Sequence, residues 1–194
     1  MSLPAATAAL AKDMLRRFGR NRRGSAIVEF ALIAPIFIAL LFAIIETSLM
    51  FLASESLETI NENAARLIRT GQAQSTYSTV GAYLTQVVCN PAPAFFTCNP
   101  SNGTSNGISV DVKSYSSFQN VAISSQIVNG NFDTSNLSYS LGGSCDVVVA
   151  RLFYKWPLFV TGLGYDIANL TGNQRLLVAT AVFRNEPYSG ACGS

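Results

Sequence analysis

The sequence predicts an α+β protein in which a long N-terminal helix, half transmembrane and half amphipathic, packs on a small antiparallel β-sheet domain. Residues 30–45 contain no polar side chain, and a helical spacing of apolar residues continues from there to Arg69. Three runs rich in β-branched and aromatic residues follow in the second half of the chain. With 49% hydrophobic and 12% charged residues, the chain has enough apolar material for one membrane segment and one modest domain.

Hydropathy divides the chain into three parts. Residues 1–24 form a basic leader. Residues 25–53 form the transmembrane part, because the run 30–45 is shorter than the roughly 20 apolar residues that a bilayer requires and the apolar residues from Leu49 onward extend it. Residues 54–194 form the α+β domain.

The leader carries the charge asymmetry of the chain. It holds six of the 13 Lys and Arg residues but one of the 11 acidic residues, so the remainder is net negative. By the positive-inside rule, the N-terminus stays cytoplasmic and the domain lies on the other side of a single-pass membrane segment, in the periplasm. An acidic domain without a basic stripe also predicts no nucleic-acid partner.

A cleavable secretory signal is a competing interpretation, since it too places a basic segment before an apolar one. Its cleavage site is missing. The positions where small residues would be needed hold Leu49, Met50, Phe51 and Leu52.

Glu29 is an acidic residue at the start of the apolar segment. A carboxylate at the centre of a membrane span costs about 2.5 to 3.5 kcal/mol, which favours a partner for it. If the chain were cut after Gly24, Ser25 would carry a free amine one helical turn from Glu29, in the same chain or facing a neighbour. The alternative is that Glu29 lies among the headgroups and is solvated.

Pro35 lies inside the apolar run. Proline removes one backbone hydrogen bond and crowds the preceding turn, so we expect a helix break here, as a kink or local unwinding.

From Leu49 onward, apolar residues recur at spacings of three and four and define a face that needs a sheet to cover it. They are Leu49, Leu52, Leu57, Ile60, Ala64, Leu67 and Ile68. Gly71 ends this helix, and residues 75–88 predict a second, short one.

The rest of the domain reads as strands joined by turns. Proline and Asn-Gly pairs make residues 89–107 a loop. The predicted strands are 108–114, 147–156 and 176–184, with a short edge strand within 117–143, turns at 129–131 and 141–144, and a helical turn at 165–170.

The segment around Gly24 resembles a known family. Basic residues, a glycine, a small residue, then Glu29 and Phe30 ahead of an apolar run are similar to the processing site of type IV prepilins. A larger set resembles more closely the TadE-like pseudopilins of the tight-adherence (Tad, or Flp) pilus: residues 23–35, Glu46, Ala64-Ala65-Arg66 and Gly71. The resemblance covers about residues 16–72, with a looser similarity at 154–157 and 182–188. Phe30 stands where major Flp subunits commonly have Tyr, which favours the pseudopilin branch.

The resemblance implies a pilin-like fold and cutting between Gly24 and Ser25 by a membrane aspartyl prepilin peptidase. It also implies a role as a minor pilin in assembling the pilus. The implied partners are the peptidase, other pilins and pseudopilins, and the inner-membrane assembly platform.

Four cysteines lie in the domain that the topology places outside the cytoplasm, where disulfides persist. We favour Cys89 with Cys98, which closes a compact Pro-containing loop, and therefore Cys145 with Cys192. Free buried thiols are the alternative. A zinc site is disfavoured because the spacing is not C-x-x-C and the chain has no histidine.

We expect no enzyme and no cofactor. Without histidine there is no Ser-His or Cys-His pair, and no nucleophile elbow or phosphate-binding loop occurs. Two classes of function remain: a pseudopilin required for pilus assembly, or a permanently membrane-anchored periplasmic binding or structural protein. An N-terminus at Ser25 would support the first and an intact Met1 the second.

Overall fold

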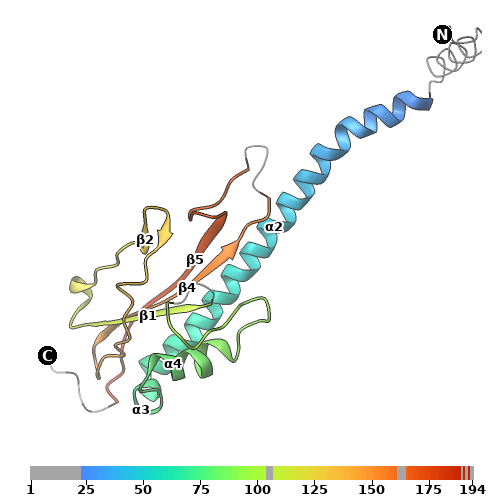
Figure 1. Ribbon diagram of the computed structural model, residues 1–194. Coiled ribbons are helices and arrows are strands. Elements are labelled where there is room, and N and C mark those ends of the chain that lie inside the picture. Colours follow the sequence, from blue (N-terminus) through green and yellow to red (C-terminus); the bar gives the residue numbers. More distant parts are fainter. Residues whose placement is uncertain (1–22, 104–106, 161–164, 189, 191, 193–194) are drawn as a thin grey trace, which may run out of the picture. The chain divides into compact units, whose positions relative to one another are not determined.

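The computed structural model describes residues 23–103, 107–160, 165–188, 190 and 192, and of Arg23 and Ser25 the backbone alone. Most of the expected leader lies outside the described residues. The chain divides into two units, one ending at Ile45 and one beginning at Glu46. The described elements are α2 (Arg23–Arg69), α3 (Gln72–Thr76), α4 (Val80–Tyr83), the π-helix η1 (Leu84–Cys89), β1 (Ser109–Tyr115), the 3₁₀-helix η2 (Phe118–Asn120), β2 (Ile127–Val128), β3 (Asn131–Phe132), β4 (Val147–Pro157) and β5 (Gln174–Arg184) (Figure 1).

The first unit contains the apolar part of α2. Its large side chains are exposed to the surroundings all round the helix, and none of its most apolar window is buried in the protein. By length and composition this helix is able to cross a membrane. Helical conformation continues through Pro35, so the helix is not unwound there, and the kink stays a prediction. Proline removes a single hydrogen bond from the ladder, and the bonds on either side keep the helix going.

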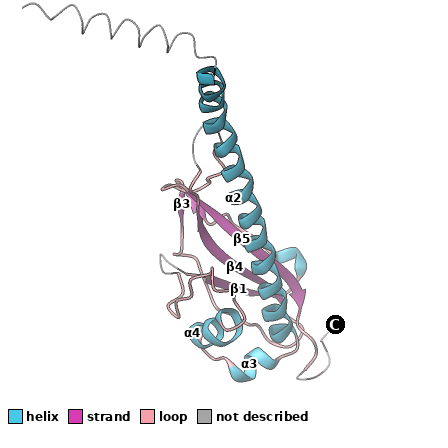
Figure 2. Ribbon diagram, turned by 90° about the vertical axis from the view of Figure 1, so that its right-hand side faces the viewer, coloured by secondary structure: helices cyan, strands magenta, loops and turns pink. Residues whose placement is uncertain are grey.

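The second unit is built on an antiparallel sheet with the strand order β1-β4-β5. All three main strands predicted from the sequence are present, with slightly shifted ends. The α+β class is thereby confirmed. In Figure 2 the C-terminal half of α2 runs alongside this sheet.

The core forms where one face of the sheet meets α2. Alternate residues of β4, among them Val148 and Leu152, pack with Leu57 and Ile68 of the helix. The amphipathic face predicted for this helix is correct from Leu57 onward, since Ile60 and Ala64 are buried and Leu67 is partly so. The prediction was wrong for Leu49 and Leu52, which are exposed, because Met50 and Ala53 fill the core on that turn.

The segment after Gly71 differs in part from the single helix predicted at 75–88. α3 ends where the Tyr77 N–H donates to the Ala73 carbonyl, and α4 starts where Thr79 accepts from the Ala82 N–H. Such a side-chain cap starts a new helix instead of prolonging the first. The predicted apolar face is nevertheless buried at Leu84, Val87 and Val88.

The opposite face of the sheet is covered by the connection between β1 and β4. Here β2 and β3 form a separate two-stranded hairpin. The edge strand predicted within 117–143 is therefore not part of the main sheet. Its turn has Asn129 and Gly130 at φ of 51° and 73°, as a tight hairpin requires. A single bridge instead places Tyr139 beside Val112 of β1.

No helical turn forms in the described part of the connection before β5, contrary to the expectation for 165–170. The N–H groups of Asn169 and Leu170 both donate to the Gln174 carbonyl, which folds this segment back on the start of β5. That pairing withdraws both N–H groups from any helix.

Two disulfides close the domain: Cys89 with Cys98, and Cys145 with Cys192. This is the pairing favoured on the sequence. The C-terminal segment also contacts the end of α2, because Glu186 donates its N–H to the Arg69 carbonyl and the Tyr188 ring lies where a Cβ on Gly71 would stand. Gly71, at φ 79°, therefore ends the helix and, because it has no side chain, leaves room for the Tyr188 ring.

Candidate functional site

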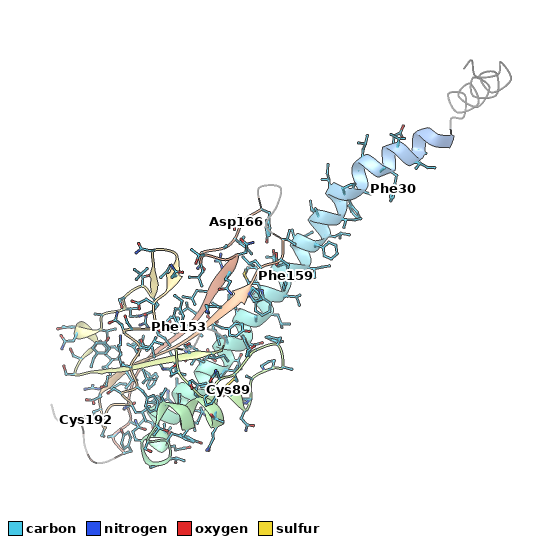
Figure 3. The ribbon with its side chains drawn as sticks, in the orientation of Figure 1. Phe30, Cys89, Phe153, Phe159, Asp166 and Cys192 are labelled. Atoms are coloured by element: carbon cyan, nitrogen blue, oxygen red, sulfur yellow. A yellow bond between two sulfur atoms is a disulfide. The ribbon has the colours of Figure 1, made fainter. Side chains whose placement is uncertain are left out.

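The predicted processing segment lies at the start of α2. Gly24 is helical and exposed, and a Cβ built on it would meet no atom within 4 Å. Glu29 and Phe30 are also exposed, and Figure 3 shows the Phe30 ring pointing away from the helix. The Ser25 side chain lies outside the described part of the chain. The backbone helix nevertheless fixes the spacing from Ser25 to Glu29 at one turn, so that both residues share a face.

This segment combines two features that suit assembly with other helices. The exposed apolar side chains favour lipid or other apolar helices as neighbours, since none of the described residues of the first unit covers them. An amine at Ser25 and the Glu29 carboxylate would add a charge pair to such a surface.

The structure assigns a role to Glu46, one of the residues that carry the family resemblance. The side chain is buried, at 6% relative exposure. Its carboxylate accepts from the backbone N–H groups of Phe159 and Val160, the second at 3.1 Å. On the next residue of the helix, the Thr47 hydroxyl bonds to the Tyr165 hydroxyl. The helix thus holds the segment that follows β4 at two points.

A buried ion pair lies within the sheet. Asp111 of β1 stands opposite Arg151 of β4, and their side chains are 1% and 5% exposed. Two guanidinium nitrogens donate to one carboxylate oxygen at 2.6 and 3.1 Å, and the other oxygen accepts from the Ser138 N–H at 2.8 Å. Arg151 also donates to the Ser124 carbonyl at 2.9 Å. These bonds fasten the 116–145 connection to the sheet, which is a structural task.

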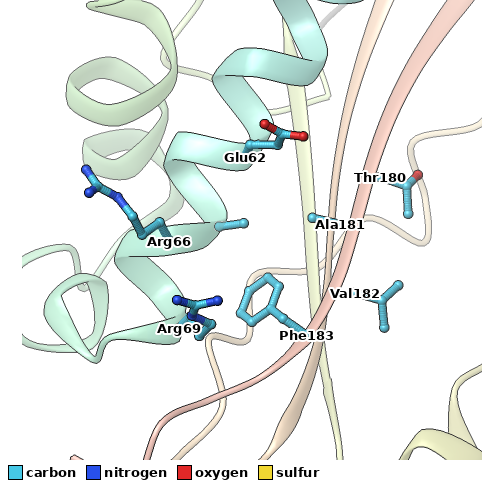
Figure 4. Close-up of a pocket in the computed structure, with 8 residues that line it drawn as sticks. Glu62, Arg66, Arg69, Thr180, Ala181, Val182 and Phe183 are labelled. Carbon is cyan, nitrogen blue, oxygen red and sulfur yellow. The ribbon is translucent and has the colours of Figure 1, made fainter.

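A surface pocket of about 380 Å³ lies along α2 and β5. Figure 4 shows Phe183 pointing toward Arg69 and the helix, whereas Thr180 and Val182 point away from it. Arg69 pairs with Glu186 at 3.3 Å, both half-exposed. The lining residues supply charges and an aromatic ring but no nucleophile held by a base.

Three tyrosines form a second polar cluster in the core. The Tyr83 ring lies 6.0 Å from Tyr77 and 5.5 Å from Tyr139, between ring centroids. Burial raises the pKa of Tyr139 to about 12 and that of Tyr83 still further above its ordinary value. Both of these hydroxyls are therefore neutral, and the Tyr139 hydroxyl donates to the Tyr77 carbonyl at 3.0 Å. Among the described residues no group of His, Cys, Asp and Glu has the arrangement of a metal site.

Comparison with known proteins bears on the first of these features. Residues 24–66 match the family model described as TadE-like protein. No curated protein and no solved structure matches the chain significantly. The matched range begins at Gly24 and takes in Glu29, Phe30, Pro35 and Glu46. The resemblance seen in the sequence is therefore confirmed over this range, where the chain is similar to TadE-like proteins.

Proposed function

We propose that this protein is a pseudopilin, or minor pilin, required for assembly of the tight-adherence pilus. The observation that carries the proposal is the TadE-like match over residues 24–66, on a helix whose apolar side chains are exposed. A prepilin peptidase cuts between Gly24 and Ser25, and the new N-terminus then packs with other pilins and pseudopilins at the inner-membrane assembly platform. The role is structural and not enzymatic.

The topology proposed for this role is a single membrane pass. The basic leader stays in the cytoplasm, and the disulfide-bonded domain lies in the periplasm or in the surface pilus. The exposed apolar part of α2 and the two disulfides support this arrangement.

Replacing Gly24 tests the proposal without disturbing the fold. Because a Cβ there meets no atom within 4 Å and valine is a better helix former than glycine, Gly24→Val keeps α2 intact. It adds bulk beside the bond to be cut, so we expect the variant to keep its leader and to form no pili. Immunoblots of membrane fractions and counts of surface pili measure both effects in a strain without the wild-type copy.

Ala26→Val is the matched control, since Ala26 is exposed on the same helix on the other side of the bond. We expect this control to be processed and piliated. Normal processing and piliation of Gly24→Val would contradict the proposal.

A further inference from the structure

We propose that the segment following β4 enters the outer boundary of the same bilayer that α2 spans, with Phe159 inserted among the lipids and Glu46 holding the segment there. This inference rests on the membrane anchoring proposed above. The surface that contacts lipid consists of four exposed side chains, called here the apolar collar. They are Leu49, Phe51, Leu52 and Phe159.

The first observation is the exposure of the collar. Phe159 is 84% exposed, and Leu49, Phe51 and Leu52 are exposed on the adjoining turns of α2. Figure 3 shows Phe159 beside the helix, whereas Phe153 lies within the domain. Large apolar side chains exposed at one level around a helix favour lipid as their surroundings.

The second observation is where the polarity of the exposed helix face changes. Up to Leu52 the large side chains on this face are apolar, and from Glu55 through Glu58 to Glu62 they are acidic. Such a switch marks the level at which lipid gives way to water. Met50 and Ala53 are already buried in the domain core at this level. The domain therefore begins to pack on the helix before the helix has left the lipid.

The third observation fixes the level of Phe159. Its N–H donates to Glu46, which precedes Glu55 by nine positions, or about 13 Å along a helix. The polar zone of one leaflet is only about 5 to 7 Å thick. Phe159 thus lies on the lipid side of the polarity switch, at the boundary between headgroups and acyl chains.

This placement also explains why an acidic residue is accommodated at position 46. A carboxylate at that depth needs hydrogen-bond donors, and two backbone N–H groups of the same domain supply them. Those N–H groups are satisfied in turn, as backbone near lipid requires. The buried Glu46 carboxylate thus holds the backbone that carries the exposed Phe159 ring.

Fluorescence quenching in nanodiscs tests the inference on the full chain. The chain has one tryptophan, so Trp156→Phe gives a silent background. Into it are placed Phe159→Trp, Phe42→Trp in the apolar run, and Phe118→Trp. Phe118 is 58% exposed and follows β1, whose last residue pairs with Val147 at the far end of β4 from Pro157. The nanodiscs hold phosphatidylethanolamine and phosphatidylglycerol, with or without bromine on the acyl chain near the headgroup.

We expect brominated lipid to remove roughly half of the emission of Phe159→Trp, as for an aromatic ring at the acyl boundary, and little from Phe118→Trp. Phe42→Trp reports whether the helix is in the bilayer. Quenching of Phe42→Trp without quenching of Phe159→Trp would overturn the inference and leave the anchoring intact. Absence of quenching at both sites would overturn the anchoring as well. Single copies per disc exclude neighbouring pilins as the source of shielding.

The role of Glu46 is tested in the Phe159→Trp background. Glu46→Ala removes the acceptor and is expected to lower the quenching, whereas Glu46→Gln keeps one acceptor oxygen and retains most of it. Glu55→Ala, an exposed residue of the same helix, is the matched control and should change nothing. Unchanged quenching in Glu46→Ala would show that Glu46 does not hold the segment.

Discussion

Asp111→Ala is expected to lower the free energy of unfolding of the domain by about 3 to 5 kcal/mol, the range for removing one partner of a buried ion pair. The variant leaves the Arg151 guanidinium 5% exposed, without the carboxylate that accepts two of its hydrogen bonds. It also leaves the Ser138 N–H without its acceptor, which loosens the 116–145 connection. Chemical denaturation of the full chain in a fixed detergent, followed by fluorescence of Trp156, measures the change.

Two further variants make this result specific to the pair. Lys113→Ala removes a partly exposed charge 3.7 Å from Asp111 and should cost less than about 1 kcal/mol. Asp111→Ala combined with Arg151→Leu should lose less stability than the two single changes added together, since no buried charge is left unpaired. Strict additivity would show that the pair does not act as a unit.

Glu29→Gln is expected to abolish or strongly reduce piliation while the protein remains inserted and processed. The change removes a charge that hydrocarbon disfavours, so insertion should be no worse. It also removes the carboxylate one turn from the Ser25 amine, which then enters the packed helices without its charge partner. Leaving one charge of a desolvated pair costs about 3 to 5 kcal/mol. The experiment compares processing, membrane fractionation and pilus counts in a strain without the wild-type copy.

Glu55→Gln serves as the control, because Glu55 is an exposed carboxylate on the amphipathic half of the same helix. It should be piliated as wild type. Normal piliation of Glu29→Gln would mean that Glu29 is a headgroup-level residue and that the pairing argument is wrong.

Features of the fold that are encoded by residues close together in the chain could be predicted from the sequence. Each of the three main strands is a run of β-branched and aromatic residues. Such a run predicts a strand without knowledge of the strands that pair with it. The spacing from Gly24 to Glu29 is likewise carried by a few adjacent residues. The compact loop between Cys89 and Cys98 also allowed the favoured disulfide pairing to be chosen.

Features that depend on distant partners were not visible in the sequence. The structural role of Glu46 was not visible because the N–H group from which it accepts lies 113 positions later. The pairing of Asp111 with Arg151 requires the register of β1 on β4, which residue patterns do not supply. Leu49 and Leu52 fit a helical core pattern equally well, and only the position of the domain shows that Met50 and Ala53 fill the core instead.

The proposed function depends most on processing at the start of α2. The direct measurement is the intact mass and N-terminal sequence of the wild-type protein purified from membranes of cells that make the pilus. We expect a chain beginning at Ser25, with both disulfides intact. A chain still beginning at Met1 in piliated cells would contradict the account and would favour a permanently anchored periplasmic binding or structural protein.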